Sequence, residues 1–198
     1  MSEIMKSAAN IRSTDLKRIH IDNQIYTCAP RGNGRLGIEM ETYALLDRLG
    51  MAYQRLDHDA TATVDDCVDV ERILGIEICK NLFLCNSAES AFYLLMMPGG
   101  KKYRAPLLSR QLATTRLSFA SAASMERLLR VSPGAVSVLG LMHDTDHAVR
   151  LLIDKDVLHH THVGCHPCVN TASLKVSLDE LLSKFLPHTG HEPIFVEL

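Results

Sequence analysis

Residue types that could do chemistry gather at three places in the sequence, and the first is Lys80. This lysine directly precedes the apolar run 81–85, which has the character of a buried strand. A lysine at the mouth of such a strand can lay its alkyl stem against the core and hold its ammonium group in a cleft. Position alone favours a simpler interpretation, in which the side chain only reaches solvent from a strand end.

The second place is the loop Ser132-Pro133-Gly134-Ala135-Val136-Ser137. Small residues allow a ligand to approach the backbone closely. A loop of this kind can present N–H and C=O groups to a substrate or to water. Taken alone, however, it is more simply explained as a connection between a helix and a strand.

The third place is the segment Gly164-Cys165-His166-Pro167-Cys168-Val169-Asn170. Pro167 biases the backbone of His166 towards an extended conformation, which would hold the imidazole in one direction. Asn170 can bridge two backbone segments or orient a ligand. A turn in which both side chains only satisfy backbone groups is equally compatible with the chemistry.

A metal site is an alternative use of the same region. Zinc favours nitrogen and sulfur ligands, and six of them crowd together at His159, His160, His162, Cys165, His166 and Cys168. No second Cys-x-x-Cys pair completes a closed site, and the pair His143 and His147 lacks the Glu of a metalloprotease helix. We therefore expect no metal and no other cofactor, with a zinc protein kept as an alternative.

Covalent catalysis has less support in the sequence. There is no Gly-x-Ser-x-Gly nucleophile elbow and no Gly-rich phosphate loop, and nothing singles out one of the six cysteines. These cysteines are expected to be reduced thiols in a cytoplasmic protein. The first twenty residues carry no apolar run of signal-peptide or membrane-spanning kind, so no membrane contact is expected.

The composition indicates what kind of domain must position these residues. The 198 residues are 46% hydrophobic and 22% charged, with no Trp, so we expect a globular domain with an aliphatic core. The formal net charge of −2 argues against a broad, non-specific nucleic-acid binder, because such proteins are usually basic. It leaves room for a local contact with the end of one RNA.

The chain pattern predicts a mixed α/β (α+β) fold. Residues 29–34 form a turn or linker by composition, so residues 1–36 are expected to be an N-terminal extension and residues 37–198 the main domain. A buried hairpin is predicted from the apolar runs 81–85 and 91–97. Further strands are expected at 53–56, 117–120 and 149–153, and helices at 40–49, 63–74, 106–112, 121–130 and 177–186. Together they predict a largely antiparallel mixed sheet flanked by helices.

The order of these features resembles the family of proteins related to the editing domain inserted in bacterial prolyl-tRNA synthetases (the YbaK/prolyl-tRNA synthetase-associated domain family). Within it, the chain is most similar to the branch that hydrolyses Ala-tRNA(Pro). The resemblance spans about residues 40–185, and its matching segments are residues 79–84, 116–121, 132–141 and 166–171.

This resemblance implies roles for eight residues. Lys80 corresponds to an essential lysine that contacts the 3′-terminal nucleotide of the substrate. Gly134 begins the loop that lines the aminoacyl pocket and positions water, and His166 corresponds to the pocket histidine. Lys80, Gly134 and His166 are thus the catalytic candidates. The substrate-binding candidates are Asn81, Ala135, Val136, Ser137 and Asn170.

The implied function is trans-editing: hydrolysis of misacylated tRNA, Ala-tRNA(Pro) above all, by water attack on the aminoacyl ester. A synthetase pocket built for proline cannot strongly reject the smaller alanine, because missing methylenes are worth only about 1–3 kcal/mol. The implied partner is the acceptor end of tRNA(Pro), with prolyl-tRNA synthetase as a further candidate. The family loop usually reads Gly-x-x-x-Pro, whereas this chain has Val138 at the last position. That difference keeps open a non-catalytic relative that binds tRNA or a small ligand as a regulator.

Overall fold

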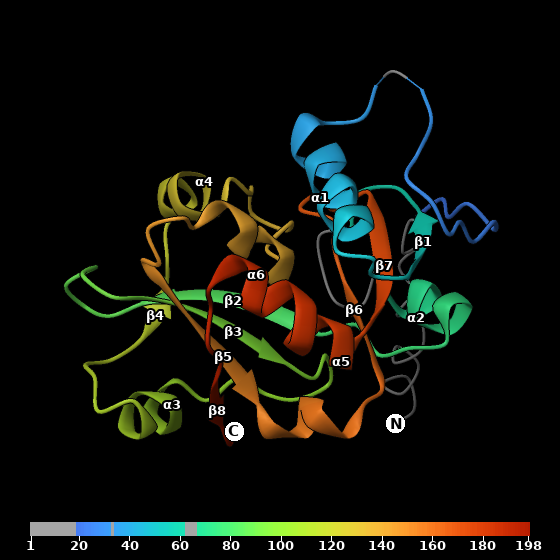
Figure 1. Ribbon diagram of the computed structural model, residues 1–198. Helices are drawn as coiled ribbons and strands as arrows, with labels where there is room; N and C mark the ends of the chain where they lie inside the picture. Colours follow the sequence, from blue (N-terminus) through green and yellow to red (C-terminus); the bar gives the residue numbers. More distant parts are fainter. Residues whose placement is uncertain (1–18, 33, 62–66) are drawn as a thin grey trace, which may run out of the picture.

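The protein is described here by a computed structural model covering residues 19–32, 34–61 and 67–198 (Figure 1). Residues 63–66, the start of the helix predicted over residues 63–74, lie outside the described residues. Within the described ranges, no helix has the length and apolar character needed to cross a membrane.

A five-stranded sheet forms the larger half of the fold, with strand order β4-β2-β3-β5-β8. Its strands are β4 (Ser118–Phe119), β2 (Lys80–Cys85), β3 (Phe92–Met97), β5 (Val149–Asp154) and β8 (Ile194–Val196). β2 and β3 form the predicted hairpin, antiparallel from Lys80↔Met97 to Cys85↔Phe92. β4 is antiparallel to β2, whereas β5 is parallel to both β3 and β8. The predicted mixed sheet is therefore confirmed.

Both faces of this sheet are covered, which explains why β3 is buried at all six positions. Phe83 and Leu94 share one core with α1 (Gly37–Arg48), α4 (Ala122–Leu129) and η2 (Val138–His143). Leu84 and Leu95 face the other way and pack with Leu108 of α3 (Ala105–Gln111). Figure 1 shows α3 and α4 on opposite sides of the sheet. The period-2 alternation of β2 thus sends neighbouring side chains into two different cores.

A second, three-stranded antiparallel sheet has the order β1-β7-β6. Its strands are β1 (Tyr53–Asp57), β7 (Ala172–Ser177) and β6 (His162–Cys165), and α2 (Val68–Leu74) packs against β1. An isolated parallel bridge joins Ile78 to Gly164 of β6. Because Ile78 lies just before β2, the two sheets meet beside Lys80. β6, β7 and β8 were not among the predicted strands.

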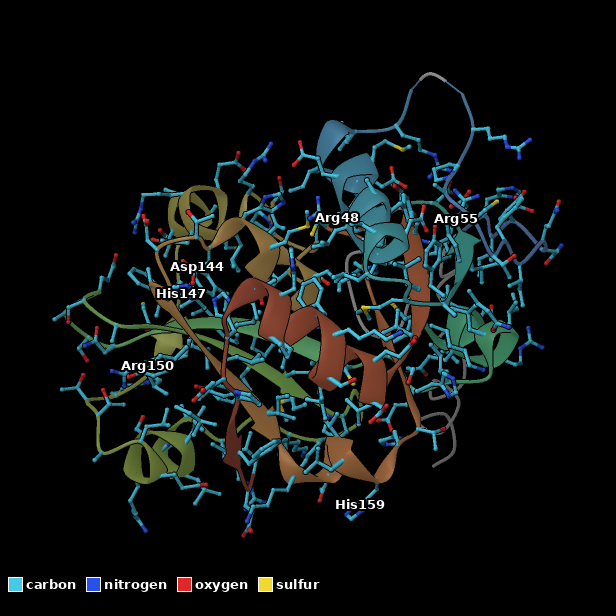
Figure 2. The ribbon with its side chains drawn as sticks, viewed as in Figure 1. Arg48, Arg55, Asp144, His147, Arg150 and His159 are labelled. Atoms are coloured by element: carbon cyan, nitrogen blue, oxygen red, sulfur yellow. The ribbon has the colours of Figure 1, made fainter. Side chains whose placement is uncertain are left out.

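Residues 20–26 lie along the outer edge of β1. Isolated bridges pair Ile21 with His58 and Tyr26 with Arg55, and the guanidinium of Arg55 lies 4.5 Å from the centre of the Tyr26 ring. Arg55 is labelled in Figure 2 at this edge. The described part of the expected extension therefore covers a strand edge that would otherwise carry unpaired backbone groups.

The C-terminal helix differs from the single helix predicted over residues 177–186. Three short pieces follow one another: α5 (Leu178–Glu180), a π-helical turn η4 (Leu181–Phe185) and α6 (Leu186–Thr189). Ser177 caps the start by accepting a hydrogen bond from the Glu180 N–H. Pro187 lies in the first turn of α6, where the missing N–H of proline is tolerated. The π turn ends at Phe185, two positions before this proline.

Candidate functional site

A cavity of about 280 Å³ opens beside the first residues of β2. Five of the eight predicted site residues line it: Lys80, Asn81, Gly134, Val136 and His166. The remaining lining comes from Thr61, Cys67, Ile78, Cys79, Leu82, Phe83, Phe119, Met125 and Pro133. The fold thus brings together side chains from three distant segments of the chain.

A gap in the sheet edge accounts for the position of the cavity. At one end of β2, the Phe83 carbonyl accepts a hydrogen bond from Ala120 N–H (2.9 Å). At the other end, the Cys79 N–H donates to the Gly164 carbonyl (3.1 Å). β4 pairs only with Leu84 and Cys85 of β2, so within the described ranges no strand lies beside residues 80–82 on that side. The cavity occupies this uncovered stretch.

Lys80 is held at the cavity by a backbone group. Its ammonium donates a hydrogen bond to the Lys101 carbonyl, with 2.7 Å between Nζ and O. Lys101 is itself anchored, since its Nζ lies 2.8 Å from Asp154 Oδ1 and 2.7 Å from Asp156 Oδ2. Asp154 is fully buried at the end of β5. The direction of the Lys80 side chain therefore depends on an ion pair beneath the neighbouring loop.

Gly134 and Asn170 form a second contact of the site. Gly134 has φ +88°, a conformation that L side chains rarely adopt, and a Cβ atom at this position would lie 3.3 Å from Asn170 Nδ2. Asn170 Nδ2 donates to the Thr61 carbonyl (2.9 Å), while the Thr61 N–H donates to the Asn170 carbonyl (3.0 Å). Asn170 thus bridges two backbone segments and holds Thr61 against the cavity.

Three of the predicted binding residues lie behind the cavity wall. Ala135 and Asn170 line a neighbouring hollow instead. Ser137 is fully buried and caps η2, its hydroxyl accepting a hydrogen bond from Leu139 N–H (3.2 Å). Val138, at the position where the family loop usually has proline, is also fully buried and begins η2. The loop is therefore held by a helix cap and by core packing.

His166 is an uncharged acceptor at the cavity. Its Nδ1 lies 2.8 Å from the Ala172 carbonyl, which can only accept, so Nδ1 carries the proton and Nε2 keeps its lone pair. Burial lowers the pKa of His166 to about 4. The ring of His58 lies 6.2 Å away, and burial lowers its pKa as well. At neutral pH the cavity wall therefore carries a neutral imidazole.

The cysteines of the site are not poised for reaction. Cys79 lines the cavity and Cys168 lies in the core behind it, and burial raises the pKa of each thiol to about 12. Burial also raises the pKa of Cys165. A protonated thiol is not a nucleophile, so these cysteines do not favour covalent catalysis.

The His/Cys cluster of the sequence is dispersed in space. Cys165 and Cys168 are buried, whereas His159 is exposed and projects outward from η3 (Lys155–His159) (Figure 2). Over the described ranges, no three His, Cys, Asp or Glu side chains come together as a group that could hold a metal ion.

Several lining residues were not singled out from the sequence. Thr61 is held in place by Asn170 from 109 positions away, which no local pattern reveals. Met125 of α4 also contributes to the cavity wall. Phe119 lies within a segment that resembled the family, yet its 63% exposure could be seen only in three dimensions.

The groups that line this cavity can bind and orient a substrate and a water molecule. Over the described residues its lining contains one charged side chain, Lys80, and no carboxylate. A carboxylate acid–base pair is thus not among the lining groups described. Hydrolysis of an activated ester does not require such a pair, because a positioned water and a polarised carbonyl suffice.

Comparisons with known proteins show the family of the chain. Residues 58–184 match the family model of the aminoacyl-tRNA editing domain. The chain is 31% identical over 157 residues to the prolyl-tRNA editing protein ProX of Acetoanaerobium sticklandii, covering 78% of this chain and 94% of that protein. It is 30% identical over 166 residues to the prolyl-tRNA synthetase associated domain-containing protein 1 of Danio rerio, covering 80% and 86%.

Solved structures share the fold at lower identity. A structure solved as a candidate trans-editing enzyme for prolyl tRNA synthetase superposes with a TM-score of 0.61 at 17% identity, covering 83% of this chain and 99% of that one. The hypothetical protein APE2540 gives a TM-score of 0.60 at 20% identity, covering 78% and 96%.

Proposed function

The chain belongs to the aminoacyl-tRNA editing domain family, and we propose that it acts in trans on misacylated tRNA(Pro), with alanine as the amino acid removed. The observation that carries this proposal is the convergence of Lys80, Gly134 and His166 on one small cavity. The proteins named for prolyl-tRNA editing among its relatives point to the same substrate.

In the proposed reaction, water attacks the carbonyl carbon of the aminoacyl ester. The bond between that carbon and the ribose oxygen breaks, free alanine leaves, and the terminal hydroxyl of the tRNA is restored. Lys80 binds the 3′-terminal nucleotide. The backbone of the loop that begins at Gly134 holds the carbonyl and the water. His166 shapes the wall and offers an uncharged acceptor.

Binding roles follow for the remaining candidates. Asn81 and Val136 line the cavity and would contact the aminoacyl group directly. Asn170 and Ser137 act through the loops that they hold, and Ala135 through packing behind the wall. The acceptor end of tRNA(Pro) is the proposed RNA partner, and prolyl-tRNA synthetase is a further candidate.

A panel of aminoacylated tRNAs tests the substrate. We expect purified protein to deacylate Ala-tRNA(Pro) at least about tenfold faster than Pro-tRNA(Pro), because an editing site that serves as a second sieve must spare the correctly charged tRNA. Cys-tRNA(Pro) and Ser-tRNA(Pro) test whether side chains slightly larger than that of alanine are also accepted. Equal rates for alanine and proline would rule out size selection, and tight binding of Ala-tRNA(Pro) without turnover would indicate a regulator.

A further inference from the structure

Phe119 stands out among the exposed apolar side chains. It is 63% exposed, and of the large exposed hydrophobic residues in the described ranges it alone lines the Lys80 cavity. An exposed aromatic ring beside a pocket is a common mark of a binding surface. The mechanism proposed above gives this ring no role.

The ring is held in a fixed position. Phe119 pairs with Leu84 across β4 and β2, and the next residue, Ala120, donates its N–H to the Phe83 carbonyl (2.9 Å). The Tyr103 ring packs against Phe119 with 6.0 Å between centroids and 53° between planes. Anchored on both sides, the ring offers a preorganised flat surface that loses little entropy on binding.

Lys80 and Phe119 lie on the same face of the sheet. Side chains alternate along a strand, so Lys80, Leu82 and Leu84 share one face of β2. Phe119 is directly opposite Leu84 and therefore points to that face as well. Lys80 and Leu84 are four positions apart, a spacing of about 13 Å along the strand. Lys80 and Phe119 thus lie at opposite ends of the uncovered stretch of β2, and both line the cavity there.

We propose that Phe119, supported by Tyr103, is the stacking surface for the nucleobase of the 3′-terminal nucleotide, while Lys80 contacts the same nucleotide. The inference rests on the proposed function. Aromatic rings bind single-stranded nucleic acid by stacking, which tolerates any base because every base has a π face. The ring selects for a nucleotide as such, and the cavity selects the amino acid attached to it.

A fluorescent end base tests the stacking without requiring hydrolysis. An oligonucleotide with the acceptor-end sequence and a 3′-terminal 2-aminopurine is titrated with the full-length protein. We expect quenching of the 2-aminopurine by the wild type and by Phe119→Trp, and loss of that quenching with Phe119→Ala. Phe195→Ala, which removes an exposed ring on β8 outside the cavity lining, is the matched control. Equal quenching by the wild type and Phe119→Ala overturns the proposal.

Kinetics separate this inference from the proposed function. With Phe119→Ala, kcat/KM for Ala-tRNA(Pro) should fall about tenfold to a hundredfold, mainly through a higher KM, whereas Phe195→Ala should keep the wild-type value. Full activity of Phe119→Leu would contradict stacking, since leucine keeps the apolar bulk without the π face. If the wild type quenches through Phe119 but hydrolyses no aminoacyl-tRNA, the stacking surface stands and the deacylase assignment fails.

Discussion

The ammonium group of Lys80 donates its hydrogen bond to the backbone carbonyl of Lys101, 2.7 Å away, and the side chain of Lys101 ends on buried Asp154. This chain of contacts links the mouth of the cavity to the end of β5. It makes Lys101 a positioning residue for the proposed nucleotide contact, although Lys101 itself does not line the cavity.

Replacing Lys101 with Met should disturb both stability and turnover. Asp154 is fully buried and would lose its cation, which should lower the free energy of unfolding by about 3 kcal/mol. Because the backbone carbonyl that accepts the Lys80 hydrogen bond would no longer be anchored by an ion pair, kcat/KM for Ala-tRNA(Pro) should fall about tenfold or more. Chemical denaturation and deacylation kinetics measure the two effects. Exposed Lys102→Met is the control, and Asp154→Asn combined with Lys101→Met should recover much of the stability.

Replacing Gly134 with Ala should damage the cavity loop. The new Cβ would meet Asn170 Nδ2 at 3.3 Å on a backbone with φ +88°. Strain of this kind costs about 1–3 kcal/mol, and displacement of Asn170 would release Thr61. We expect a loss of kcat/KM that exceeds the loss of stability. Gly50→Ala is the matched control, because Gly50 also has positive φ (+62°) but no atom within 4 Å of an added Cβ. Similar activity losses in the two variants would contradict a specific role for the Gly134 contact.

The stability of the protein should fall as the pH drops from about 6.5 to about 4. Burial lowers the pKa of His166 to about 4 from the usual 6.5 of a histidine, so over this pH range the unfolded chain binds a proton that the folded protein does not bind. The contribution is present above pH 6.5 and lost below about 4. The free energy of unfolding should depend less steeply on pH in His166→Gln than in the wild type. Some dependence should remain, because burial also lowers the pKa of His58.

Restoring proline at position 138 should be tolerated. Val138 is the first residue of η2, a position where proline fits the backbone, and neighbouring Ser137 already caps the turn through Leu139 N–H. We expect Val138→Pro to fold and to keep or raise deacylation activity. Thermal unfolding and kcat/KM for Ala-tRNA(Pro) check both statements. Proline placed at Leu139 would remove that capping N–H and serves as the destabilising control.

The β2–β3 hairpin could be predicted from sequence because its information is local. Two apolar runs separated by polar residues 86–90 are enough to define a buried antiparallel pair, and the observed register agrees. β7 was not predicted because it contains serine and lysine, although it is the central strand of the three-stranded sheet. Buried Ser173 is accommodated by a hydrogen bond to His58, 115 positions earlier, which no local pattern contains.

Part of the candidate site could be predicted from the sequence, namely which segments contribute to it. Lys80, Gly134 and His166 were each ambiguous alone, and only their order along the chain pointed to a common site. The directions of the side chains depended on tertiary packing. Ser137 and Asn170 were expected to bind substrate, but they lie behind the wall because one caps η2 and the other bridges to Thr61. Phe119 was overlooked because its exposure follows from the short reach of β4.

The most direct test of the central claim is the single-turnover rate of Ala-tRNA(Pro) deacylation by the wild type and by Lys80→Ala, with Lys102→Ala as the charge-matched control. The account predicts hydrolysis well above the spontaneous rate for the wild type and the control, and a loss of about a hundredfold or more for Lys80→Ala. A wild-type rate equal to spontaneous hydrolysis, or an undiminished rate for Lys80→Ala, would contradict it.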